Sequence, residues 1–203
     1  MSEFSSAAAD AGSREAPDAG GRVDLLVAGA GYVGLATAVA IADAAPGLKI
    51  LVVDAAPDGA WQKDGRASAV AAAAIRMLTT LGIWHKLEPE AQPITEMIVT
   101  DSRTSDVVRP VFLTFGSQGG GSRGGGAETS PGEPFAHMVP NVALNGALRE
   151  RAETLGIEVR SGTAVTAIEH RAASIGVRLS GGDGSDGTTI DARLLVACDG
   201  LKS

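Results

Sequence analysis

The chain has 203 residues, of which 44% are hydrophobic and 3% aromatic, so it can hold one ordinary domain with a core of alanine, valine, leucine and isoleucine. The net charge of −7, without any dense basic cluster, argues against nonspecific nucleic-acid binding. The single cysteine excludes an internal disulfide and a cysteine-based zinc site, which fits a reducing compartment.

Residues 1–22 are rich in alanine, serine, glycine and acidic side chains, and we expect a disordered tail. This segment has neither a basic start nor an apolar core, so it does not match a secretory signal. No apolar run approaches the length that spans a bilayer. The sequence therefore predicts a cytoplasmic protein.

The next segment has the pattern of a strand, a glycine-rich turn, a helix and a second strand. The strands are predicted at 23–28 and 49–54, and the helix at 32–44. Because the helix has almost no polar face, we expect it to be covered on most sides. The turn has the spacing of a dinucleotide site, for which the predicted contacts are Gly29, Ala30, Gly31, Tyr32, Val33 and Gly34.

Each glycine of this turn has a mechanical role in such a site. Gly29 permits the tight turn, Gly31 lets phosphate oxygens approach the backbone, and Gly34 lets helix and strand pack closely. The pyrophosphate is then stabilised by the helix N-terminus. Asp54, at the end of the second strand, is placed to accept a hydrogen bond from a ribose 2′-OH and would repel a 2′-phosphate. The alternative is a glycine-rich turn in another kind of α/β domain.

The remaining chain predicts further helices and strands. A helix is expected over 68–81, capped by Ser68 and ended by Gly82, and another over 141–155, with Asn141 as its N-cap. Residues 116–134 are predicted to form a flexible glycine-rich loop. Strands are predicted at 94–100, 107–114, 157–160, 165–169, 175–179 and 192–198.

The third parallel strand of a dinucleotide fold comes late in this order, at 157–160. A plain NAD-dependent dehydrogenase would place that strand soon after Asp54. The strands within 94–140 are therefore expected to form a substrate-facing layer.

Three blocks of the sequence resemble the FAD-dependent aromatic hydroxylases of the para-hydroxybenzoate-hydroxylase type, and most of all the ubiquinone-biosynthesis hydroxylases. The blocks are GAGYVGLATAVAIA with VVDA after it, GRASAVAAAAIRMLTTLGIW, and MVPNVALNGALRERAETLGIEVRSGTAVTAIE followed by LLVACDGLKS. Their order across residues 23–203 is more specific than any one block. The resemblance implies an FAD-binding domain that corresponds to the N-terminal part of such an enzyme.

The resemblance also implies roles for residues outside the glycine turn. Asp199 and Gly200 would help to hold the pyrophosphate region of FAD, Arg66 would lie near the pyrophosphate or ribityl side, and Val165 would offer its backbone to the adenine. From the residues alone, Arg66 could equally be a surface arginine paired with Asp64. An Asp-Gly pair such as 199–200 is also common in turns.

The fold class predicted is α/β, a Rossmann-like three-layer FAD-binding fold with inserted substrate-domain β-strands and a truncated C-terminus. The predicted function is hydroxylation of an aromatic ring, on a ubiquinone precursor that carries a polyprenyl tail, with FAD, NAD(P)H and O₂. A substrate of that kind would bring the protein to a membrane surface or a biosynthetic complex. The alternatives are an NAD-dependent dehydrogenase and a non-catalytic FAD-binding fragment. The flavin supplies the chemistry, so no catalytic residue is predicted, and the histidines lack metal-ligand spacing.

Overall fold

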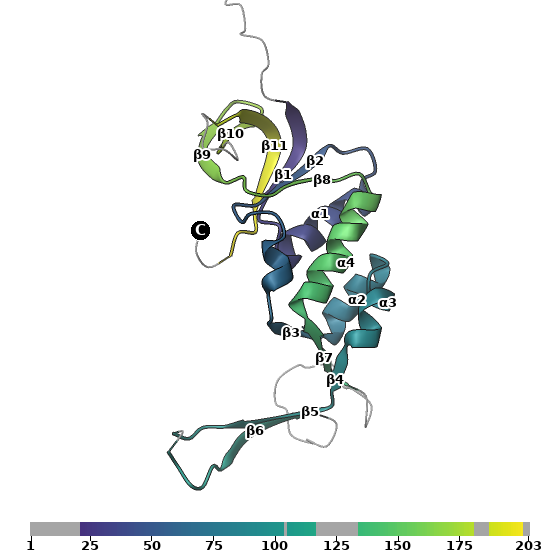
Figure 1. Ribbon diagram of the computed structural model, residues 1–203, viewed down its shortest axis with the longest axis vertical. Helices are drawn as coiled ribbons and strands as arrows, with labels where there is room; N and C mark the ends of the chain where they lie inside the picture. Colours follow the sequence, from purple (N-terminus) through teal and green to yellow (C-terminus); the bar gives the residue numbers. More distant parts are fainter. Residues whose placement is uncertain (1–20, 104, 117–133, 181–186, 201–203) are drawn as a thin grey trace, which may run out of the picture.

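The computed structural model describes residues 21–103, 105–116, 134–180 and 187–200 of the chain. Residues 1–20 of the predicted tail and residues 117–133 of the predicted glycine-rich loop lie outside these described residues. The described part contains a mainly parallel sheet with helices packed on it, a small antiparallel sheet and a two-stranded hairpin (Figure 1).

A six-stranded sheet forms the centre of the fold. Its strands lie in the order β8-β2-β1-β11-β10-β9, and the first four run parallel to one another. The predicted late third strand is confirmed, because β8 pairs with β2 in parallel and places Glu158 opposite Leu51. The strands are β1 Arg22–Ala28, β2 Ile50–Val53, β8 Glu158–Arg160, β9 Val165–His170, β10 Ile175–Leu179 and β11 Thr189–Ala197.

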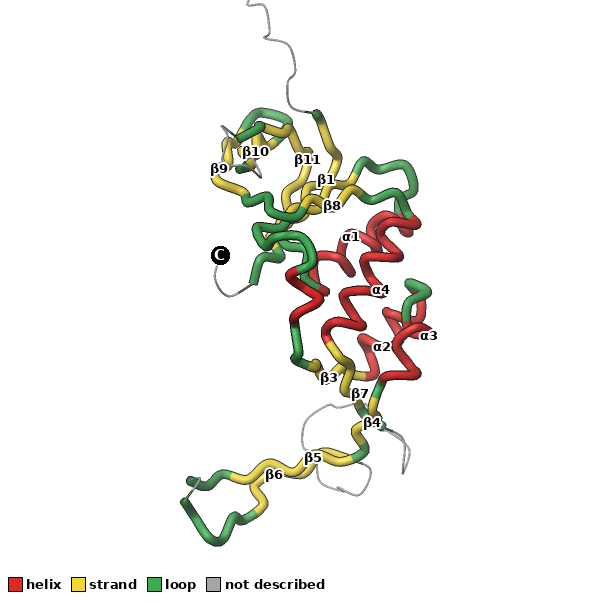
Figure 2. Tube along the Cα trace, in the orientation of Figure 1, coloured by secondary structure: helices red, strands yellow, loops and turns green. Residues whose placement is uncertain are grey.

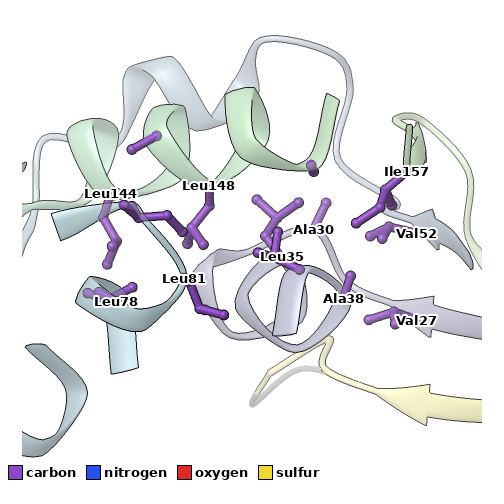
Figure 3. Packing of buried hydrophobic residues seen from close by; sticks show 14 of the residues in the cluster. Val27, Ala30, Leu35, Ala38, Val52, Leu78, Leu81, Leu144, Leu148 and Ile157 are labelled. Atoms are coloured by element: carbon purple, nitrogen blue, oxygen red, sulfur yellow. The ribbon is translucent and has the colours of Figure 1, made fainter. Parts of the chain in front are cut away.

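Two helices cover one face of this sheet. Helix α1 (Tyr32–Ala44) has the predicted bounds, and helix α4 (Asn141–Thr154) packs beside it. Their apolar side chains meet those of β1 and β2 in a cluster whose members Leu35, Leu148 and Val52 are fully buried (Figure 3). Burial of aliphatic surface of this kind is the main term that stabilises a helix layer on a sheet.

The opposite face of the sheet is also buried, although no helix of the described residues packs on it. Leu26 of β1 and Leu51 of β2 share a cluster with Val177 and Leu179 of β10. In Figure 1 the β9–β10–β11 end of the sheet curls round at this side. The α/β Rossmann-like class is thus confirmed, and the antiparallel strands cover the face that the helices leave open.

A second sheet of three antiparallel strands lies next to the helices, with β7 between β3 and β4. The sequence did not indicate β7. The remaining elements of this region are β3 Ala67–Ala71, β4 Gln92–Ile94, β7 Ala136–Pro140, α2 Ala72–Thr80, α3 Trp84–Leu87 and the 3₁₀ segments η1 Ala60–Lys63 and η2 Glu88–Glu90.

The prediction of a helix over 68–81 is wrong in its first part. Residues 67–71 pair with β7, and the helix begins only at Ala72. Alanine favours a helix by a small free energy, which the hydrogen bonds and packing offered by β7 outweigh. The predicted end is confirmed, since Gly82 follows the helix with a φ of +71° that favours glycine.

A hairpin of β5 (Glu96–Thr100) and β6 (Val111–Gly116) extends away from the rest of the fold (Figure 2). The strand predicted over 94–100 is interrupted at Thr95, so its two halves belong to different sheets. The strand predicted over 107–114 begins only at Val111, after Pro110. Proline has no N–H to give to a strand pair, which is the physical reason for the late start.

Two predicted helix caps are wrong. Pro140 holds the N-cap position of α4 and provides no side-chain cap, while Asn141 is the first helical residue. Ser68 lies inside β3, and its hydroxyl donates to Oδ1 of Asn141 at 2.7 Å. Both short polar side chains therefore join two distant chain segments, because the fold brings each within reach of the other.

The start of α1 packs closely against the main chain of the turn. A methyl group on Gly34 would overlap with the carbonyl oxygen of Gly29 and would lie 3.2 Å from Cβ of Cys198. Because the first of these neighbours is backbone, it cannot move without opening the turn.

We expect Gly34→Ala to lower the free energy of unfolding by about 2 kcal/mol. Denaturant unfolding measures this change. Gly65→Ala is the matched control, since a methyl group at Gly65 would meet no atom within 4 Å. Equal stability of the two variants would show that Gly34 is not confined by the turn.

Candidate functional site

The turn between β1 and α1 leaves an open surface at Gly31. A methyl group there would meet no atom within 4 Å, whereas one on Gly29 would overlap with the carbonyl of Cys198. Gly29 also has a φ of +107°, which favours glycine. Helix α1 starts directly after Gly31 and has no side-chain cap. An uncapped helix start with an open approach suits an anionic group, so the residues present fit the predicted pyrophosphate.

Asp54 links the end of β2 to this turn. Its Oδ2 accepts a hydrogen bond from the Ala30 N–H at 2.6 Å, and its Oδ1 accepts one from the Ala56 N–H at 2.7 Å. Each carboxylate oxygen has a second acceptor site. Asp54 thus holds the turn in shape and keeps capacity to accept a hydrogen bond from a ligand hydroxyl.

A small pocket of about 180 Å³ opens where β1, β2 and β11 end. It brings together four of the predicted residues, Gly29, Asp54, Val165 and Asp199, although they lie far apart in the sequence. Gly200 follows Asp199 with a φ of +84°. This placement agrees with the rule that ligands of parallel sheets bind beyond the carboxyl ends of the strands.

A larger pocket of about 410 Å³ lies on the other side of Asp54 and contains Ala30, Gly31 and Arg66. It also contains residues that sequence reasoning missed, notably Lys63, Asn145 and Arg149. The guanidinium of Arg149 stands over the Trp61 ring, 5.4 Å from its centroid. Asn145 and Arg149 are four residues apart on α4, a spacing that puts them on one face and could have indicated them.

Arg66 is held by Asp64 at the edge of this pocket. Its Nε donates to Asp64 Oδ1 at 2.7 Å and its second terminal nitrogen donates to Oδ2 at 2.8 Å. The Arg66 side chain is 82% exposed and that of Asp64 19%. The surface pairing that the sequence left open is therefore present, and both partners also line the pocket.

An apolar pocket of about 670 Å³ lies between α1, β3 and α2. Tyr32 and Val33, which follow the glycine turn, line its mouth and are 39% and 57% exposed. Met77 of α2 adds to this surface with 45% exposure. Helix α1 is covered on most sides, as expected, since residues 34–43 are buried or half-buried, and this pocket, which Ala36 and Ala40 also line, lies along its open side.

The family model for an FAD binding domain matches residues 22–203. The chain belongs to this family of FAD-binding domains. Ubiquinone hydroxylase UbiL from Rhodospirillum rubrum is 32% identical over 184 residues, which cover 89% of this chain and 38% of UbiL. The predicted resemblance to FAD-dependent hydroxylases is confirmed, and FAD is the cofactor that the family match indicates.

Two solved structures show the same fold. OxyS anhydrotetracycline hydroxylase from Streptomyces rimosus superposes with a TM-score of 0.64 and 28% identity, covering 88% of this chain and 32% of OxyS. The flavin-dependent monooxygenase PieE, solved with FAD and substrate, superposes with a TM-score of 0.70 and 22% identity, covering 93% of this chain and 31% of PieE. The chain therefore spans about a third of each of these proteins.

None of the helices in the described ranges is long and apolar enough to cross a membrane. Within the same ranges, no three His, Cys, Asp or Glu side chains gather into a group that could hold a metal ion. Cys198 is half-buried and packs at the edge of the helix-side core, where it behaves as a small hydrophobic residue.

The pKa of the Asp64 carboxyl lies well below its ordinary range, chiefly because the Arg66 side chain donates to it and also because Asn141 does. A carboxyl with a lowered pKa stabilises the fold above its unfolded pKa, and this contribution is lost as the pH falls through the lowered value.

We expect ¹³C NMR titration to find Asp64 still ionised at about pH 3, where an ordinary aspartate with a pKa of about 3.9 is mostly protonated. Arg66→Ala should move the titration midpoint upward, because the largest cause of the shift is removed. An ordinary midpoint in the wild type would disprove the ion pair.

Proposed function

We propose that the glycine turn binds the pyrophosphate of FAD at the start of α1. Gly31 gives the phosphate oxygens access to the backbone, and the first amides of the helix stabilise their charge. Gly29 and Gly34 keep the turn in shape. The residues proposed to surround the pyrophosphate with their main chain are Ala30, Tyr32 and Val33. The open approach at Gly31, within a chain of this family, is the observation that supports this proposal most strongly.

The two pockets that Asp54 borders are proposed to hold the groups on either side of the pyrophosphate. The adenosine would occupy the small pocket, with its ribose 2′-OH donating to Asp54 and its adenine next to the backbone of Val165. Asp199 and Gly200 would border the pyrophosphate from the end of β11. Arg66 would offer positive charge from the larger pocket.

The full enzyme is proposed to hydroxylate an aromatic ring with NAD(P)H and O₂. FAD, when bound, supplies the transfer of electrons from NAD(P)H and of one oxygen atom to the ring. The residues of this chain would bind and orient the cofactor and exclude water, so no protein nucleophile or metal is needed. A ubiquinone precursor is the proposed substrate, because the relative with 32% identity is named a ubiquinone hydroxylase.

Residues 94–140 are proposed to face the substrate within the domain formed by 23–203. The hairpin supports this proposal, since Ile98 and Phe112 are 55% and 71% exposed on it. A two-stranded ribbon with such apolar side chains has little stability alone and needs a covering surface. A polyprenylated ring would bring the enzyme to a membrane surface or to a biosynthetic complex.

Gly31→Val should abolish FAD binding and leave the fold intact. The added side chain finds open space in the protein, but it occupies the path by which phosphate reaches the backbone. Quenching of flavin fluorescence measures binding, and thermal unfolding serves as the control for folding. A valine variant that binds FAD as tightly as the wild type would place the pyrophosphate elsewhere.

Asp54→Ala should weaken FAD binding by about 1.5 to 3 kcal/mol, the range for a hydrogen bond to a charged group. Isothermal titration with FAD measures the change. Asp58→Ala is the matched control, because Asp58 is an exposed acid four residues further along the same loop. If the two variants bind FAD with equal affinity, Asp54 does not contact the ribose.

Oxidation of NAD(P)H by the full enzyme, dependent on a quinone precursor, tests the activity itself. Coupled formation of hydroxylated product is expected. Flavin binding without any NAD(P)H oxidation would support a binding-only protein, and a colourless protein that binds NADH would support a dehydrogenase.

A further inference from the structure

We propose that Asn141 is a positioning residue that holds Arg66 in place beside the phosphate site. The proposal rests on the FAD site proposed above and adds a residue from another part of the chain. Asn141 is the first residue of α4, but its side chain faces the segment 64–68. Only 4% of Asn141 is exposed, so its polar groups depend on protein partners.

Every polar group of Asn141 is hydrogen-bonded. Nδ2 donates to Asp64 Oδ2 at 3.0 Å, and Oδ1 accepts from the Ser68 hydroxyl at 2.7 Å. The main-chain N–H donates to the Arg66 carbonyl at 2.9 Å, and the main-chain carbonyl accepts from Asn145 Nδ2 at 3.0 Å. Three of these four bonds fasten the segment that carries Arg66 to the amino end of α4.

The hydrogen bond from Asn141 holds the Asp64 carboxylate in place, and Asp64 in turn positions the guanidinium of Arg66. Asp64 accepts from two nitrogens of Arg66, at 2.7 and 2.8 Å, and so fixes the plane of the group. Arg66 is mostly exposed and would otherwise lose much rotamer freedom when it meets an anion. Asn141 thus acts on the anion site through Asp64.

The position requires an amide. A carboxylate faces Nδ2 and a hydroxyl faces Oδ1, so the side chain must donate on one side and accept on the other. Aspartate has the same size but would place a second carboxylate oxygen against Asp64. Two carboxylates at hydrogen-bond distance from each other share a proton, and the pKa of one of them rises.

The test is the affinity of the 203-residue chain for FAD between about pH 5.5 and pH 8, measured by flavin fluorescence. At about pH 8, Asn141→Asp should raise the Kd about tenfold, the ratio for loss of one hydrogen bond to a charged group. As the pH falls, a shared proton restores the bond between residues 141 and 64, and the Kd should return toward the wild-type value.

The wild-type chain is the reference for pH, because it has the same charged and titratable neighbours. Around this pair, these neighbours are Arg66, Lys63 and Arg149, which line the same pocket as Asp64, and Tyr32 of α1, whose charge acts on Arg66. Val142→Asp is the matched control, since it adds the same charge one residue further on, at a side chain with 36% exposure. Its Kd should not recover as the pH falls, because an exposed aspartate with a pKa of about 3.9 stays ionised over this pH range.

Arg66→Ala distinguishes positioning from a role in folding alone. Without Arg66, Asn141→Asp should change the Kd less than about twofold, since two residues that act as a unit are not additive. A tenfold loss that persists without Arg66 would overturn the proposal. Ser68→Ala, which removes one bond from the amide, gives a second variant if Asn141→Asp unfolds. It should raise the Kd about threefold, and only when Arg66 is present.

The outcomes separate this inference from the function on which it rests. If the wild-type chain does not bind FAD, both fail. If the wild type binds FAD and Gly31→Val does not, while Asn141→Asp binds like the wild type at about pH 8, only the role of Asn141 is refuted. A pH-dependent loss that needs Arg66 supports both.

Discussion

The structure depends on a contact of main chain with main chain where β1 turns into α1. The carbonyl of Gly29 lies against Gly34, and Gly29 itself lies against the end of β11 at Cys198. Asp54, from the end of β2, holds the Ala30 N–H at 2.6 Å. Three strand ends therefore meet with almost no side chains between them. This arrangement leaves the helix start open, and an anionic ligand can reach amides that a bulkier turn would cover.

A second constraint comes from α4, which lies beside α1 and closes the site from the other side. Its amino end is tied through Asn141 to the segment with Asp64 and Arg66, and its next turns place Asn145 and Arg149 in the larger pocket. The core packing of α4 against α1 thus sets the distance between the glycine turn and the cationic side chains. The stability of the fold and the proposed binding of FAD therefore depend on the same contact.

Local charge explains how an acidic protein can hold an anionic cofactor. The chain carries a net charge of −7, yet the pocket beside Gly31 is lined by three cationic side chains, Lys63, Arg66 and Arg149, against two acidic ones, Asp54 and Asp64. Backbone amides at the helix start add positive potential that no count of side chains includes. The net charge of the chain affects its solubility and its nonspecific binding, whereas the electrostatic potential in the pocket depends on the groups that line it.

The β1–α1–β2 unit, the glycine turn and the late parallel strand could be predicted from the sequence, because they follow from local periodicity and from the spacing of the glycines in the turn. It did not indicate β3, where the edge of β7 outweighs the helix preference of alanine, or the side-chain hydrogen bonds of Asn141, whose partners lie more than seventy residues earlier in the chain. It also missed Lys63 and Arg149. Such features depend on contacts between distant segments, which form only once the core has packed, so the local sequence pattern carries no signal for them.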